Sequence, residues 1–228
     1  MKIKISNYST AKCNDSIFGQ IKYNNGCWFW KSLNKKRHQL LRQSQQNVTF
    51  KNYNKTLSNN PIVILILESP HSDEFTNKKN PCAACGISGK SIANHLCDIF
   101  NNNAKYKNNS NILKSYLNNC KASTLDIWVV NSVQYQCSLG ITPVCNLIKE
   151  SNWIDEWYSK RNNFLSRFAY LQNGNQNYVI INLCTKGVFV PMKEIVKDLL
   201  TTNNIIQNNY CEGPHPASWE RLKYVEIR

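Results

Sequence analysis

The most uniformly hydrophobic segment of the chain is residues 62–67, in which every residue is an apolar, β-favouring one. A strand with one face in water would alternate apolar and polar residues, so an unbroken run predicts a strand that is covered on both faces. Pro61 and Pro70 bracket the run too tightly for a buried helix. The segment therefore predicts a central strand of a parallel sheet.

The rest of the pattern alternates strands with helices. β-type runs predict further strands at 17–23, 126–130 and 178–184. Helical spacing or composition predicts helices at 31–46, 91–100, 112–119, 153–171 and 192–200, and a helix or a tail at the C-terminus. This alternation is typical of α/β proteins with right-handed crossovers between parallel strands.

We expect residues 1–60 to form an N-terminal accessory region beside a main domain at 61–228. The aromatic cluster at 27–30 is expected to pack against that domain. The helix predicted at 31–46 carries a run of basic residues. Such a run either contacts phosphates or is a solvated face.

The net charge of the chain indicates the kind of partner that it binds. The 228 residues include 28 Lys and Arg but only 14 Asp and Glu, a formal net charge of +14. This predicts a polyanionic partner, most simply nucleic acid, although an AT-rich genome would also enrich Lys, Asn and Ile. The chain has no apolar run of the ~20 residues that a membrane helix needs, and its N-terminus does not resemble a signal peptide. We therefore expect a cytoplasmic protein whose cysteines are mostly free thiols.

Polar side chains follow the predicted strands at the points where those strands end. They are Glu68, Ser69 and His71 after the first, Asn131 after the second, Lys186 and Gly187 after the third, and the Gly-Pro-His-Pro loop at 213–216. Each alone is typical of an ordinary turn. Because the carboxyl ends of parallel strands meet in one crevice, we expect them to lie close together.

The order of these motifs resembles that of the uracil-DNA glycosylase superfamily. The segment 67–71 (Leu-Glu-Ser-Pro-His) resembles its water-activating loop, and the segments 86–96, 129–133 and 215–218 resemble its Gly-Arg-x-Gly, Thr-Asn-Val-Val and His-Pro-Ser motifs. The resemblance covers about residues 61–221 and is nearest the iron–sulfur branch. With the alternation of strands and helices, it implies an α/β fold: a three-layer sandwich around a central, mainly parallel four-stranded sheet.

Two departures from this pattern bear on the site. Ser69 stands where the classical enzymes have their water-activating Asp, and His71 where they have Tyr. The Cys-x-x-Cys of the iron–sulfur branch is missing ahead of the first motif; Cys82 and Cys85 follow it instead. A single pair is a weak metal signature, so we expect no metal and no cofactor, with a site that includes Cys137 or Cys145 as the alternative.

The resemblance implies a role for each residue. Glu68, with Asp73 as reserve, would orient water or stabilise the sugar cation, and His215 would donate to the departing base. Asn131 would recognise the Watson–Crick edge of the flipped base, His71 would line the pocket, and Ser69 would bind water or phosphate. Glu68 as a capping or ion-pair residue and Asn131 as a turn residue are the alternatives.

Two segments are candidates for DNA contact. The residues we expect there are Gly86, Ser88, Gly89, Lys90, Ser91, Ser218, Trp219 and Arg221. Trp219 is either a wedge that holds the duplex open or a core aromatic. The segment 86–91 also superficially resembles a Walker A loop, but Ala84 stands where its first Gly should be and no strand immediately precedes it.

The resemblance implies a monofunctional DNA glycosylase that hydrolyses an N-glycosidic bond and leaves an abasic site, and we expect a monomer. The substrate is a uracil-type base or a hypermodified cytosine, the latter fitting a role against phage; the loop insert and Ser69 favour the second. The alternatives are a catalytically inactive DNA-binding module of the same fold and a nucleotide-binding α/β protein that uses the segment 86–91.

Overall fold

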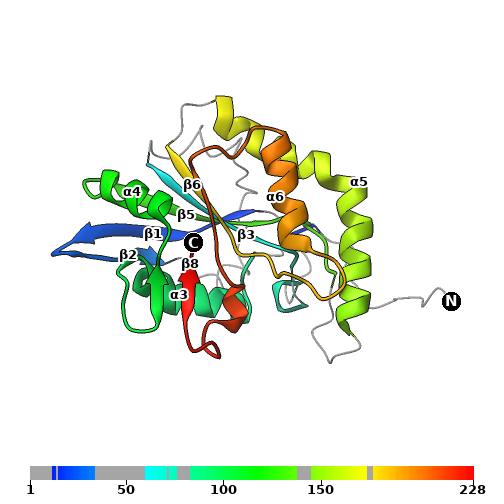
Figure 1. Cartoon of the computed structure of the whole chain (residues 1–228), viewed down its shortest axis with the longest axis horizontal. Coiled ribbons are helices and arrows are strands. Elements are labelled where there is room, and N and C mark those ends of the chain that lie inside the picture. The colour runs from blue at the N-terminus through cyan, green and yellow to red at the C-terminus, as the bar shows by residue number, and fades with distance from the viewer. Residues whose placement is uncertain are drawn as a thin grey trace.

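The computed structural model describes residues 12–13, 15–33, 60–70, 72–75, 83–137, 145–173 and 177–228. Within these ranges the main sheet has six strands, with helices on both of its faces (Figure 1). In spatial order the strands are β2 (Cys27–Leu33), β1 (Ser16–Asn24), β5 (Thr124–Asn131), β3 (Ile62–Leu67), β6 (Tyr178–Asn182) and β7 (Tyr210–Glu212). The predicted α/β class is therefore confirmed.

The sheet is wider than predicted. Strands β5, β3, β6 and β7 run parallel to one another, which matches the four parallel strands expected. Strands β1 and β2 add an antiparallel hairpin at the β5 edge. Its two-residue turn is Asn25-Gly26, with φ values of 48° and 85°, the left-handed geometry that tight hairpins require. The N-terminal region thus contributes strands to the main sheet, and the prediction of four strands was too low.

The prediction of a helix at 31–46 is wrong at its start, because residues 31–33 are the end of β2; residues 34–46 lie outside the described part of the chain.

The C-terminal segment is not a helix either. Strand β8 (Val225–Ile227) pairs in parallel with β4 (Tyr106–Asn108) in a small second sheet. Short 3-10 turns lie at η1 (Ser72–Phe75) and η2 (Pro216–Ser218).

The central strand β3 divides the hydrophobic core into two layers. All six of its side chains are buried, as the unbroken apolar run predicts. Its odd-numbered residues pack with α3 (Ile87–Phe100) and α4 (Asn111–Asn119). Its even-numbered residues pack with α5 (Cys145–Asn173) and α6 (Met192–Thr202). This alternation gives the three layers visible in Figure 1.

The strand order creates a crevice beside β3. The chain passes from β3 to its neighbour β5, then crosses to β6 on the other side of β3 and continues outward to β7. Connections therefore leave β3 and β6 in opposite directions, and ligands of open α/β sheets bind at the carboxyl ends of strands at such a switch point. None of the helices in the described ranges is both long enough and apolar enough to cross a membrane.

Candidate active site

A cavity of about 230 Å³ lies at the carboxyl ends of β3 and β6, where the switch point predicts a ligand site. Its walls come from the loop after β3, η1, the start of α3, one side chain of α5, the loop after β6 and the His-Pro loop. The lining residues are Leu67, Glu68, Ser69, Pro70, Glu74, Gly86, Ile87, Ser88, Lys149, Thr185, His215 and Ala217. Distant parts of the sequence therefore meet at one small cavity.

Glu68 is the most heavily contacted polar residue of this cavity and is only 3% exposed. Its Oε1 accepts a hydrogen bond from Lys149 Nζ at 2.6 Å. Its Oε2 accepts from the backbone N–H of Thr185 at 3.2 Å and lies 3.3 Å from His215 Nε2. Both carboxylate oxygens are thus directed by groups from three other segments of the chain.

The backbone of Glu68 is fixed as firmly as its side chain. Its carbonyl oxygen accepts from the Ser132 hydroxyl at 2.6 Å, the Trp153 indole N–H at 2.9 Å and the Val133 N–H at 3.0 Å. Ser132 and Val133 follow the end of β5, so the neighbouring strand holds this turn directly. The carboxylate is therefore presented to the cavity without freedom to turn away.

The surroundings keep Glu68 ionised. Burial would raise its pKa, but the adjacent His215 and the Lys149 ammonium outweigh burial and lower the pKa to about 2. For Lys149, burial would lower the pKa, and the Glu68 carboxylate outweighs it and raises the pKa above its usual value. The two side chains are therefore a charged pair at neutral pH.

His215 presents one defined ring nitrogen to the cavity. Its Nδ1 accepts a hydrogen bond from the backbone N–H of Ala217 at 3.3 Å, which leaves Nε2 to carry the proton. The Ser218 hydroxyl donates to the His215 carbonyl at 2.7 Å, and the Trp219 indole donates to the Pro214 carbonyl at 2.9 Å. These bonds hold the loop with the His215 N–H directed toward Glu68.

Among the residues predicted from sequence, Glu68, Ser69, His215, Gly86 and Ser88 line the cavity. Ser218 and Arg221 line the groove beside it. Lys90 is exposed on the first turn of α3. His71 and the side chain of Asp73 lie outside the part of the chain that the structure describes.

Asn131 does not face the cavity, contrary to the role expected for it. Its side chain is fully buried, and its amide nitrogen donates to Cys13 Sγ at 3.8 Å. The residue is still inside β5, paired in register with Leu67, so the pleat directs its side chain to the face of the sheet where Cys13 and Val129 are buried. The sequence located this strand end but not the direction of the side chain.

Three residues expected at the DNA surface are buried. Trp219 is 0% exposed and packs in the core between the sheet and α3, so it is the core aromatic and not the wedge. Gly89 lies against the turn before α3, where a Cβ atom would be 1.6 Å from the Ala84 carbonyl oxygen. Ser91 is buried behind it. Gly89 therefore serves close packing and does not cradle a phosphate.

Three residues at the site escaped the sequence analysis. Glu74 is a buried second carboxylate that lines the cavity and accepts from Cys13 Sγ at 3.8 Å. Lys149 lies on the first turns of α5, upstream of where helical spacing predicted that helix to begin. Thr185 contributes its backbone N–H. Only Thr185 had a usable signal, since it follows a predicted strand.

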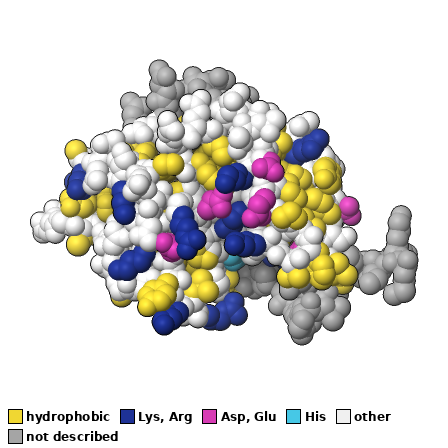
Figure 2. Space-filling model, viewed as in Figure 1, with side chains coloured by type: hydrophobic (Ala, Val, Ile, Leu, Met, Phe, Trp, Pro, Cys, Tyr) yellow, Lys and Arg dark blue, Asp and Glu magenta, His cyan; other side chains and the backbone are white. Residues whose placement is uncertain are grey.

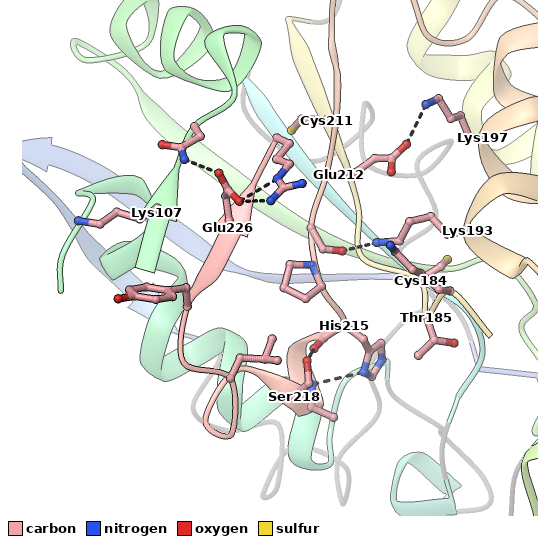
Figure 3. A pocket seen from close by; sticks show the side chains of 18 of the residues that line it. Lys107, Cys184, Thr185, Lys193, Lys197, Cys211, Glu212, His215, Ser218 and Glu226 are labelled. Atoms are coloured by element: carbon pink, nitrogen blue, oxygen red, sulfur yellow. Dashed lines mark hydrogen bonds and ion pairs between the residues drawn. The ribbon is translucent and has the colours of Figure 1, made fainter. Parts of the chain in front are cut away.

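A larger groove of about 1230 Å³ adjoins the cavity and shares Thr185, His215 and Ala217 with it (Figure 3). Its other lining residues come mainly from the loop after β6, α6, β7, β8 and the C-terminal loop. They include the cations Lys107, Lys186, Lys193, Lys197, Arg221 and Arg228 and the anions Glu212 and Glu226. Lys197 pairs with Glu212 at 3.0 Å and Arg228 with Glu226 at 2.5 Å, and Lys193 is buried with its amine on the Gly213 carbonyl. Lys107, Lys186 and Arg221 then give the groove an excess of positive charge. Lys and Arg side chains are interspersed with fewer Asp and Glu on the face seen in Figure 2.

No three His, Cys, Asp or Glu side chains within the described ranges are grouped so that they could hold a metal ion. Cys85 is buried, whereas Cys82 lies outside those ranges. Cys137 is a free thiol, and burial raises its pKa to about 12, which disfavours the thiolate that a metal requires.

Comparison of the chain with models of protein families, with curated proteins and with solved structures found no match in any of the three. The function of the protein is therefore inferred from the geometry of the site. That geometry is an ionised carboxylate facing a histidine N–H in a small cavity that opens into a basic groove.

Proposed function

We propose that the protein is a DNA glycosylase that hydrolyses the N-glycosidic bond of a nucleotide turned out of the DNA strand. The observation that carries the proposal is the pairing of the ionised Glu68 carboxylate with the His215 Nε2–H at 3.3 Å on the wall of a base-sized cavity. The motif order that resembles the uracil-DNA glycosylase superfamily supports the same activity.

The sizes of the two hollows fit this substrate. A cavity of about 230 Å³ is below the ~300–1,000 Å³ of pockets for drug-sized ligands, which suits one heterocyclic base. The adjoining groove carries unpaired cations such as Lys186 and Arg221, which suit the phosphates of a strand. The uncapped N-terminus of α3, at Gly86, adds a partial positive charge at the mouth of the cavity.

The chemical step develops positive charge on the sugar and negative charge on the departing base, and the site has to stabilise both. Breaking the bond between C1′ and the base nitrogen leaves a cationic sugar and moves the bonding electron pair onto the base. Glu68 would stabilise the sugar cation and orient the water whose oxygen bonds to C1′. The proton that this water loses after the bond has formed is taken up by the base anion, which leaves as the neutral base. A carboxylate with a pKa of about 2 is a weak base, so we assign it an electrostatic role and not early removal of the water's proton.

His215 serves the departing base. Its Nε2–H would donate to a base oxygen on which negative charge develops. The 3.3 Å contact with Glu68 is longer than the ~2.7–2.9 Å of strong charge-assisted hydrogen bonds. A base that enters the cavity would meet this N–H beside the Glu68 carboxylate. Lys149 keeps Glu68 ionised beside it.

The structure bears differently on the two alternatives, a nucleotide-binding protein and an inactive DNA-binding module. Nucleotide binding by the segment 86–91 is disfavoured, because Gly89 and Ser91 are packed inside the molecule. An inactive DNA-binding module would have the same basic groove, so activity decides between it and a glycosylase. Within the glycosylase proposal, uracil-type bases and hypermodified cytosines are both candidate substrates.

The test is a cleavage assay on labelled oligonucleotides that carry uracil, hydroxymethylcytosine or glucosylated hydroxymethylcytosine, followed by alkali to break abasic sites. The proposal predicts strand breakage on at least one substrate, with a loss of about 10²-fold or more in Glu68→Gln and His215→Ala. Lys114→Ala is the control, because Lys114 is an exposed residue of α4 that lines neither hollow. Salt-sensitive DNA binding without cleavage of any substrate would refute the glycosylase proposal and favour the binding module.

A further inference from the structure

Lys193, the second residue of α6, is a buried lysine that the proposed hydrolysis does not use. It lies on the wall of the groove, is only 4% exposed, and its amine donates a hydrogen bond to the Gly213 carbonyl. Within the described ranges no Asp or Glu forms an ion pair with it; Glu212, on the same wall, pairs with Lys197 instead. A buried ammonium without a counter-ion is costly. Burial accordingly lowers the pKa of this amine, which favours its neutral, nucleophilic form.

Lys193 is tied to two of the segments that wall the cavity. Gly213, which its amine contacts, lies two residues before His215 on the same loop. The backbone carbonyl of Lys193 accepts from the side-chain amide of Asn182 at 3.1 Å, and Asn182 lies three residues before Thr185. Figure 3 shows Lys193 on the groove wall with its amine directed at the loop that leads to His215. The position of this amine relative to the site is therefore set by the residues that build the site.

The place of Lys193 suits the sugar of the target nucleotide and not its base. The groove and the cavity join at Thr185, His215 and Ala217, whereas Lys193 lines the groove alone. A strand that lies in the groove with one base in the cavity has to pass its sugar through this junction. Once the base has left, C1′ of that sugar is free to turn from the cavity toward the groove wall.

We propose that Lys193 attacks the abasic sugar left by base hydrolysis and forms an imine with its C1′, which gives the protein a lyase activity at abasic sites. The inference rests on the proposed function as the source of this sugar. It goes beyond the monofunctional enzyme that the resemblance implies. Hydrolysis comes first, so the intact abasic strand is the first product and the substrate of Lys193.

The reaction balances with solvent water and its protons alone. Opening of the sugar ring breaks the C1′–O4′ bond, moves the proton of the C1′ hydroxyl to O4′ and leaves an aldehyde. The lone pair of Lys193 Nζ bonds to C1′, and the aldehyde oxygen leaves as water with one proton from the amine and one from solvent, which gives a protonated imine. Water then removes a proton from C2′, a double bond forms between C2′ and C3′, and the phosphate on O3′ leaves with the electron pair of the C3′–O bond. Hydrolysis of the imine returns the free amine.

The test uses DNA in which the abasic site is made beforehand, so it does not depend on base release by this protein. Sodium borohydride reduces the imine by adding hydride at C1′, which leaves a stable covalent link between protein and DNA. The wild-type protein should form this adduct, and peptide mass spectrometry should locate the DNA on Lys193. Lys193→Arg keeps the positive charge but cannot form the imine, so its adduct should fall by about 10²-fold or more. Lys114→Ala, on α4, should match the wild type.

Strand breakage is the second readout, measured on the same DNA without borohydride or alkali. The wild-type protein should break the strand on the 3′ side of the abasic site, and Lys193→Arg should not. No adduct with the wild-type protein, or an adduct located on another residue, would overturn the inference and leave the glycosylase proposal intact. An adduct on Lys193 without release of any tested base would support the inference and count against the proposed function. The location of the wild-type adduct decides the matter even where a Lys193 variant does not fold.

Discussion

Replacing Glu68 by glutamine removes one negative charge and keeps the size of the side chain. The amide resembles the protonated carboxyl group, so the substitution measures how much the folded protein stabilises the charge. The pKa of Glu68 falls from 4.5 to about 2 on folding, because His215 and Lys149 outweigh the cost of burial. At about 1.4 kcal/mol per pKa unit, this corresponds to a free energy of unfolding lower by about 3 kcal/mol in Glu68→Gln at pH 7.

The sign of the pH dependence follows from the lowered pKa. A carboxyl group whose pKa is depressed in the folded state stabilises the protein above its unfolded pKa, and this stabilisation is lost as the pH falls through the folded value. The window for Glu68 is therefore about pH 5 to pH 2. The difference between wild type and Glu68→Gln should stay at about 3 kcal/mol down to pH 5 and shrink to about 1 kcal/mol at pH 3.

The assay is urea unfolding at pH 7, 5 and 3, followed by the fluorescence of buried tryptophans such as Trp153. Trp153 packs beside the site and donates to the Glu68 carbonyl, so it reports on this region. If burial outweighed the effect of His215 and Lys149 on Glu68, Glu68→Gln would be more stable than the wild type at pH 7. That result, or a destabilisation that does not change with pH, would refute the assignment of Glu68 as a stabilised anion.

Three further predictions concern packing, DNA binding and base preference. Trp219→Ala should lower the free energy of unfolding in urea by about 3–5 kcal/mol, since it empties a core position; a change below about 1 kcal/mol would contradict the packing. Lys186→Ala and Arg221→Ala should each reduce the salt dependence of DNA affinity by about one charge, whereas Lys114→Ala should not; equal slopes in all three would exclude the groove as the phosphate track. Glu74→Gln should lower the ratio of kcat/KM for cytosine-type bases to kcat/KM for uracil-type bases by about tenfold or more. The reason is that a carboxylate only accepts hydrogen bonds and therefore favours a base with an exocyclic amino group. An unchanged ratio would show that Glu74 does not contact the base.

The sequence predicted the backbone of the site better than its side chains. The apolar run at 62–67 identified the central strand, and the polar residues after it identified the edge where Glu68 and His215 meet. Glu68 and His215 can meet only because the carboxyl ends of the four parallel strands lie at one edge of the sheet. The direction of a side chain is set by pleat and packing instead, which is why the positions of Asn131 and Trp219 differ from those expected.

Other features had no local signature in the sequence. Lys149 and Glu150 are charged residues near the start of a long helix, and a solvated face has the same composition. Their roles depend on contacts with Glu68 and with the loop at 188–190, which only the fold brings together. The hairpin of β1 and β2 is different, because the Asn25-Gly26 pair between two β-type runs is a strong local signal for a hairpin.

The most direct test of the central claim is to identify the products by mass spectrometry after incubating the wild-type protein with DNA that carries the candidate bases. The account predicts release of one free base and an oligonucleotide that has lost that base and gained a hydroxyl group at C1′. Both products should be missing with Glu68→Gln, which retains the groove and its cations. Unchanged DNA, or equal base release by wild type and Glu68→Gln, would contradict the assignment of the cavity as a glycosylase site.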